Sequence, residues 1–182
     1  MISMKKIFVV VAILFSVSSF AQVTKATLTA SGLTCSMCSK AIYEALKKVN
    51  TIESIKANIS KSNYNIVFKK DAVVSFDELK NAVEGAGFFV AKLEVAINFD
   101  SVEVKNDTHI TAAGLNLHFL NVKDQVLTGE KVITVLDKDF ETAKEFKKIT
   151  QYTTMKCLET GVMGACCNDK GTTGERVYHV TI

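Results

Sequence analysis

The chain contains no proline and no tryptophan, and its charges nearly cancel. Its 22 lysine and arginine residues face 19 acidic residues, a net charge of +3. The chain without residues 1–21, which contain Lys5 and Lys6, has 20 basic and 19 acidic residues and a net charge of +1. Binding of nucleic acid or of an anionic membrane needs a basic surface, so neither partner is expected.

Long apolar runs and catalytic motifs are also lacking. The apolar run at residues 7–17 is far shorter than the roughly 20 residues that span a bilayer, so the mature protein is not expected to cross a membrane. The glycines of residues 161–174 lack the lysine and the spacing of a phosphate-binding loop. Neither a Ser-His-Asp set nor a carboxylate pair follows from spacing, so the sequence predicts no enzyme activity.

The start of the chain is typical of a targeting segment. Lys5 and Lys6 precede an apolar run, and Ser19-Phe20-Ala21 offers the small residues that a signal peptidase reads. We therefore expect residues 1–21 to be a signal peptide, cleaved before Gln22, and the protein to be periplasmic or secreted. The alternative is an uncleaved N-terminal anchor.

Two cysteines, Cys35 and Cys38, form a Cys-x-x-Cys pair just before a helical run. Backbone N–H groups and the positive end of the helix dipole favour thiolate over thiol at such a position. Paired thiolates either bind a soft metal ion or exchange disulfides. In the periplasm or outside the cell, where this protein is expected, unprotected thiols tend to oxidise. Because the cysteine count of five is odd, at least one thiol must stay free, bind metal or pair with another chain.

Residues 22–98 are predicted to form the element order β-α-β-β-α-β. The β-like runs are Val23–Ala30, Ile52–Ile59, Tyr64–Phe68 and Phe88–Ile97. Apolar residues at helical spacing indicate helices that start at Ser39 and Phe76. Ser75 and Glu78 have the spacing of a capping box for the second helix. Right-handed crossovers would place both helices on one face of a four-stranded antiparallel sheet, a ferredoxin-like α+β fold.

Several positions together are typical of one family. They are Gly32, Thr34, Cys35 and Cys38 after the first strand, and Gly87-Phe88 after the second helix. In these positions the chain resembles the heavy-metal-associated domains of copper chaperones, metal-exporting P-type ATPases and the periplasmic mercury-binding protein. The resemblance implies that Cys35 and Cys38 are metal ligands and that Phe88 packs beside the metal loop. Leu33 stands where the family usually has a methionine that supports the loop, which is a mild change.

The ligand set points to a soft metal ion. Two thiolates with no carboxylate or imidazole nearby suit Cu(I), or Hg(II) as the main alternative. Zn(II) usually takes four ligands, and relatives that bind it often add an acidic residue where this chain has Thr34. Met37, between the two cysteines, is either a weak third ligand or a residue that faces solvent or a partner.

The sequence thus predicts an exported, non-enzymatic metal-binding protein. It would scavenge one ion, or pass it by thiolate exchange to a metal-exporting transporter or another metal-binding protein. The alternative is a periplasmic thiol-disulfide oxidoreductase that uses Cys35 and Cys38. Thioredoxin-like enzymes carry a tryptophan before the first cysteine and a cis-proline facing the pair, and this chain has neither.

The second half is predicted as a polar linker at residues 99–108 followed by a small α+β domain at residues 109–182. Its family is not recognised, and an OB-like barrel is an alternative architecture. The expected strands are Leu115–Val122, Lys131–Leu136 and Arg176–Ile182, with a turn at Leu127–Glu130 and a helix at Asp139–Thr150.

The segment 155–167 is rich in sulfur. It contains Met155, Cys157, Met163, Cys166 and Cys167. One hypothesis is a second soft-metal site. Another is a disulfide from Cys157 to Cys166 or Cys167, which would stabilise the loop by roughly 2–4 kcal/mol. A third is that these thiols are inert or linked to a partner. His118 and His179 are expected to be structural residues of strands, His109 lies near the linker, and none of the three is expected to bind metal.

Overall fold

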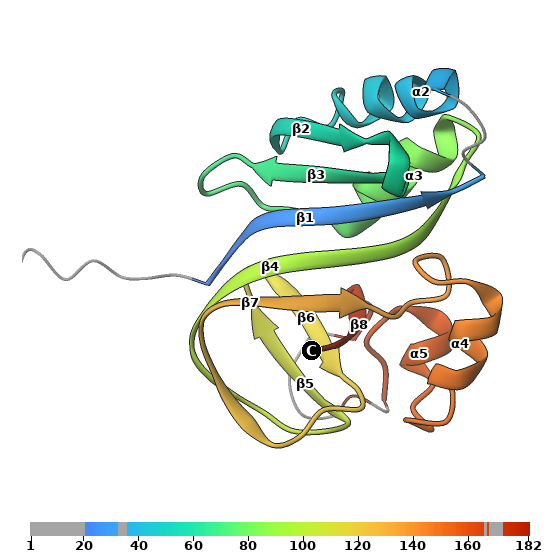
Figure 1. Cartoon of the computed structure of the whole chain (residues 1–182). Coiled ribbons are helices and arrows are strands. Elements are labelled where there is room, and N and C mark those ends of the chain that lie inside the picture. Colours follow the sequence, from blue (N-terminus) through green and yellow to red (C-terminus); the bar gives the residue numbers. More distant parts are fainter. Residues whose placement is uncertain (1–20, 33–35, 166, 168–172) are drawn as a thin grey trace, which may run out of the picture.

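The computed structural model describes residues 21–32, 36–165, 167 and 173–182 (Figure 1). The first half contains β1 (Gln22–Ser31), α2 (Ser36–Leu46), β2 (Ile52–Asn58), the short 3-10 helix η1 (Ile59–Lys61), β3 (Asn63–Phe68), α3 (Phe76–Gly85) and β4 (Phe89–Val104). The second half contains β5 (Thr108–Ala112), β6 (Leu115–Phe119), β7 (Gln125–Val135), α4 (Ala143–Ile149), α5 (Cys157–Thr160) and β8 (Val177–Thr181). The strand order across the described sheet is β2-β3-β1-β4-β7-β8-β6-β5.

The first half is the predicted ferredoxin-like module. Its strands β2, β3, β1 and β4 are all antiparallel to their neighbours. Alternate residues of β1 and β3 are buried, which is the period-2 pattern of a sheet with one covered face. The helices α2 and α3 contact each other and bury their apolar residues in the same core. The predicted α+β fold class is confirmed.

The capping box predicted at the start of α3 is wrong. Ser75 has the extended backbone of an N-cap, but its side chain makes no capping hydrogen bond. Its hydroxyl instead lies 3.4 Å from the hydroxyl of Tyr178 on β8. A tertiary contact has replaced the local one.

The predicted linker at residues 99–108 is wrong for its first part, because β4 continues through it. β1 pairs with β4 only as far as the partners Gln22 and Asn98. β7 pairs with β4 from Leu93 and continues beyond that point, up to the partners Gln125 and Val104. The polar residues of this stretch are largely exposed on the strand, so its composition was similar to that of a linker.

The turn predicted at Leu127–Glu130 is also wrong, since β7 runs straight through these residues. Gly129 has a φ of 70° and lies opposite Phe99, where the register between β4 and β7 shifts. The extra residue of this β-bulge is on β4, where Asp100 and Ser101 lie opposite Thr128 alone, and Ser101 has a φ of 51°. The left-handed φ of Gly129 beside the bulge favours glycine at that position of β7.

The rest of the second half completes the sheet. β8 lies between β7 and β6 and is parallel to β6. Among the described strands β5 pairs only with β6 and forms an edge, so the OB-like alternative is wrong.

The helix predicted from Asp139 begins later, at Ala143. The hydroxyl of Thr142 caps it there by accepting a hydrogen bond from the backbone N–H of Glu145 at 3.3 Å.

One apolar core extends through both halves. It includes Leu28 and Leu79 from the first half and Leu117 and Val180 from the second. α4 and α5 pack over a separate small cluster of Leu120, Leu136, Ile149 and Leu158. Within the described residues, no helix combines the length and the apolar composition needed to cross a bilayer.

Arg176 ties the two halves together by polar contacts. Its Nε and Nη2 donate to the carboxylate of Asp77 on α3 at 2.8 and 3.3 Å, and Nη2 also donates to Asp137 at 2.8 Å. Nη1 donates to the carbonyl oxygen of Gly161, which caps α5, at 3.0 Å. Burial alone would raise the pKa of Asp77, but the hydrogen bonds and charge of Arg176 hold it below its ordinary value.

We expect Arg176→Met to lower the free energy of unfolding by about 2–4 kcal/mol. The reason is that Asp137, only 6% exposed, would lose its cationic partner. Urea unfolding followed by circular dichroism measures the change. Lys148→Met is the control, because it removes an exposed cation from a pair with Glu145 and should leave the midpoint nearly unchanged. Equal losses in the two variants would contradict this role for Arg176.

Candidate metal centres

Cys38 lies in the first turn of α2, which begins at Ser36. It is half-buried, whereas its neighbour Met37 is 80% exposed. This position places the sulfur near the N-terminal amide groups of an 11-residue helix. The other predicted residues of the loop, Leu33, Thr34 and Cys35, lie outside the described residues.

Gly32 and Phe88 lie next to each other at the start of the loop. Gly32 has a φ of 81°, a left-handed conformation that favours glycine. A Cβ atom added there would lie 3.8 Å from the ring of Phe88, so this aromatic residue does lie beside the start of the loop. Phe88 itself is partly buried against the main core.

Tyr64 on β3 contacts the first turn of α2 and supports it, a role that the sequence did not suggest. Its hydroxyl lies 3.0 Å from the hydroxyl of Ser39 and donates to the backbone oxygen of Ser39 at 3.1 Å. Burial raises the pKa of Tyr64; the hydrogen bond to Ser39 opposes this and the charge of Cys38 adds to it. A neutral phenol therefore anchors the residue that directly follows Cys38.

A second group of potential ligands lies in the other half of the molecule. His109 on β5 and His118 on β6 are directly opposite each other in register, and His118 is in turn opposite His179 on β8. Residues opposite one another in a sheet share a face, so the three imidazoles form a row across three strands. All three side chains are buried, with His109 and His118 stacked at 4.0 Å between ring centroids.

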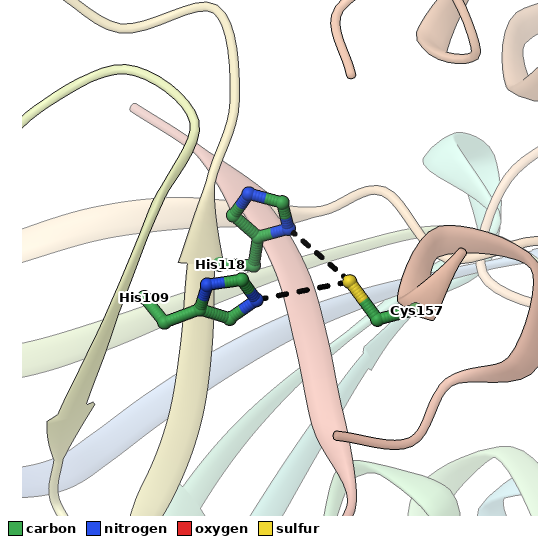
Figure 2. Close-up of side chains that lie close together, drawn as sticks. All are labelled: His109, His118 and Cys157. Atoms are coloured by element: carbon green, nitrogen blue, oxygen red, sulfur yellow. Dashed lines mark hydrogen bonds between the residues drawn. The ribbon is translucent and has the colours of Figure 1, made fainter. Parts of the chain in front are cut away.

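The sulfur of Cys157 faces two of these rings. It lies 3.7 Å from Nε2 of His109 and 3.8 Å from Nδ1 of His118, as Figure 2 shows. Cys157 is the first residue of α5, and its side chain is 1% exposed. The three donor atoms lie within 4.8 Å of one another.

His118 is held as a neutral imidazole. Burial lowers its pKa to about 3, with contributions from His109 and His179 and an opposing effect of Asp107. Its Nε2 lies 3.0 Å from the Asp107 carboxylate, which can only accept a hydrogen bond. The ring proton is therefore on Nε2, and Nδ1 directs a lone pair toward Cys157.

The structure places the cysteines of the 155–167 segment only in part. Cys157 and Cys167 are both buried in one apolar cluster with Met163 and Val177. Cys166 lies outside the described residues, so the predicted disulfide from Cys157 stays a prediction. The expectation that no histidine binds metal missed the approach of His109 and His118 to Cys157. The one available signal was a histidine in the middle of an apolar strand at residues 115–119.

Comparison with known proteins matches the first half of the chain. Residues 27–89 match the model of the heavy-metal-associated domain. The copper chaperone CopZ of Staphylococcus epidermidis is 28% identical over 67 residues, which are 37% of this chain and 97% of that protein. Two solved structures are also similar. A copper-binding domain of HMA7, a P-type ATPase, is 28% identical over 36% of this chain and 86% of its own, with a TM-score of 0.33. A CopZ metallochaperone is 24% identical over 37% of this chain and 100% of its own, with a TM-score of 0.35.

The first half is thus a ferredoxin-like module with a cysteine in the first turn of its first helix. Within it, residues 27–89 form a heavy-metal-associated domain. The match ends at residue 89, so the second half, with its histidine row, lies beyond it.

We expect Tyr64→Phe to lower the free energy of unfolding by about 1–2 kcal/mol, because the variant loses its hydrogen bonds to Ser39 in a fully buried site. Urea unfolding measures the loss. Tyr43→Phe is the matched control. Tyr43 is half-buried on α2, the helix that contains Ser39, and its change should alter the midpoint little. The interpretation fails if both variants unfold at the wild-type midpoint.

Proposed function

We propose that this protein binds one Cu(I) ion through Cys35 and Cys38 and passes it on by thiolate exchange, without catalysing a reaction. The observation that carries the proposal is Cys38 in the first turn of α2, in a domain that is homologous to copper chaperones. Its recipients would be a metal-exporting transporter or another metal-binding protein.

Exchange of the ion requires a ligand that an incoming partner can reach. Cys38 is half-buried and Met37 beside it is exposed, so the ion would sit at the surface of the helix start. An incoming thiolate or thioether would join the two sulfurs in a three-coordinate intermediate, and one of the original thiolates would then leave. Lys40 on α2 and Lys47, directly after its end, are exposed and available to steer an acidic partner.

Two thiolates without a nearby hard ligand favour Cu(I) over Zn(II). Thr34 precedes the first cysteine, where an acidic residue would add a hard oxygen ligand. Hg(II) satisfies the same preference for two sulfurs and is the competing ion.

We further propose that residues 1–21 are removed and that the mature protein acts in the periplasm or outside the cell. The proposal is supported by the charged and apolar pattern of residues 5–17 and by the start of β1 at Gln22. Mass spectrometry of the protein from fractionated native cells should find Gln22 at the N-terminus outside the cytoplasm. Intact residues 1–21 in the cytoplasmic fraction would contradict it.

We expect Cys38→Ser to weaken Cu(I) binding at the loop by more than about 100-fold, since changes in the second shell alone cost 10- to 100-fold. Competition between the reduced protein and a colorimetric Cu(I) chelator measures the affinity. Met37→Leu is the matched control, because it removes the adjacent thioether and keeps both thiolates.

The control also decides the role of Met37, since a Met37→Leu variant with wild-type affinity excludes it as a ligand. Wild-type protein that cannot compete with the chelator would contradict Cu(I) binding. Turnover in an insulin-reduction assay that is lost in Cys38→Ser would instead favour the oxidoreductase alternative.

A further inference from the structure

We propose that His109, His118 and Cys157 form a second metal site, which binds one copper ion through two imidazole nitrogens and one thiolate. The three residues come from β5, β6 and α5, all beyond the heavy-metal-associated domain. The site does not depend on Cys35 and Cys38, so it stands or falls separately from the proposed function.

The spacing of the donor atoms fits a single ion. With metal–sulfur bonds of about 2.3 Å and metal–nitrogen bonds of about 2.0 Å, tetrahedral to trigonal angles give sulfur–nitrogen separations of about 3.5–3.7 Å. The observed separations from Cys157 are 3.7 Å to His109 and 3.8 Å to His118. The sulfur–nitrogen separations therefore suit a single ion, and to bind it the two stacked rings would turn so that both nitrogen lone pairs point at it.

The surroundings of His118 are those of a metal ligand. Metal-binding histidines usually donate their second ring N–H to a carboxylate, which fixes the tautomer and the ring orientation. Asp107 occupies this position, 3.0 Å from Nε2, and leaves Nδ1 to bind the ion. The register of β5 against β6 brings His109 next to the same ring, so that both histidines approach Cys157 from one side.

The donor set favours copper. Two histidines and one cysteine in a trigonal arrangement, with a weak thioether nearby, are typical of copper sites, whereas structural zinc usually has four strong ligands. Cys157 packs in an apolar cluster with Met163, a buried thioether, and with Val177. These neighbours exclude water and offer no hard oxygen ligand from their side chains.

A cavity lies next to the cysteine of the site. It has a volume of about 390 Å³ and is lined by residues that include Cys157, Val162, Met163 and Thr173. When the ion binds, the thiol proton of Cys157 leaves to solvent and the sulfur binds as thiolate. His109 binds through Nε2, with its ring proton on Nδ1.

The test uses the full chain with Cys35→Ser and Cys38→Ser, which removes the loop pair. The reduced protein is loaded with Cu(I) under anaerobic conditions and dialysed, and its copper content is measured. We expect about one copper per chain, and a fall of at least about tenfold when Cys157→Ala is added. Addition of Cys167→Ala is the matched control: this cysteine is buried in the same cluster, outside the group of three donors, and its loss should leave the copper in place.

Co(II) provides a second readout that does not depend on copper retention. The double variant should show a thiolate-to-Co(II) charge-transfer band, which Cys157→Ala abolishes and His109→Gln weakens or shifts. Circular dichroism and urea midpoints of the metal-free variants check that each one folds.

The proposal is overturned if the folded double variant holds no copper, or if Cys157→Ala retains it. Equal loss of copper in Cys157→Ala and Cys167→Ala would point to a dithiolate or disulfide in place of the proposed ligands. Zinc bound at the three residues to the exclusion of copper would overturn the choice of metal. Alkylation of Cys157 at the same rate with and without copper would indicate a reactive thiol instead of a ligand.

Discussion

The whole structure depends on the 16-residue strand β4, which pairs with β1 along one edge and with β7 along the other. Its first part closes the ferredoxin-like module, and its second part extends past the end of β1. The heavy-metal-associated domain is therefore continued by a further set of strands in the same sheet. The bulge opposite Gly129 lets β4 change direction without losing β7, so the hydrogen-bonded ladder resumes on both sides of it.

Side-chain contacts also connect the two halves of the chain. The ring of Tyr178 packs 4.6 Å from that of Phe76, and Arg176 binds carboxylates from both halves. Because Arg176 also holds the carbonyl of Gly161, the same network fixes the end of α5. Gly161 donates in turn to the backbone oxygen of Cys157 at 2.7 Å. The first half of the chain thus helps to orient a cysteine in the second.

The two sulfur-containing sites differ in ways that suit different tasks. Cys38 is partly accessible at the start of a helix, where a partner could reach an ion bound as we propose. Cys157 is buried beside two stacked imidazoles, where the surrounding side chains keep a protein partner away from the sulfur. An accessible, low-coordinate site favours transfer, and a buried site with one more ligand favours retention.

Much of the first half was predictable because its signals are local. Alternating residues identified β1 and β3, and the run of apolar residues after Cys38 identified α2. The errors arose where tertiary contacts overrode composition. Exposed polar residues after Phe99 were taken for a linker although β7 keeps them in the sheet. Gly129 was taken for a turn although it lies inside β7, next to a bulge in β4. Ser75 failed to cap α3 because Tyr178, about a hundred residues away, takes up its hydroxyl.

The sequence by itself determined the ferredoxin-like module, its family and the position of Cys38 at a helix start, since each follows from neighbouring residues and their spacing. Only the tertiary structure decided that β4 pairs with strands of both halves and that His109 and His118 lie close to Cys157. The two histidines face each other through the pairing of β5 with β6, and the cysteine reaches them through the packing of α5. Register between strands is set by the whole buried face, and a shift of one residue would turn His118 away from the sulfur.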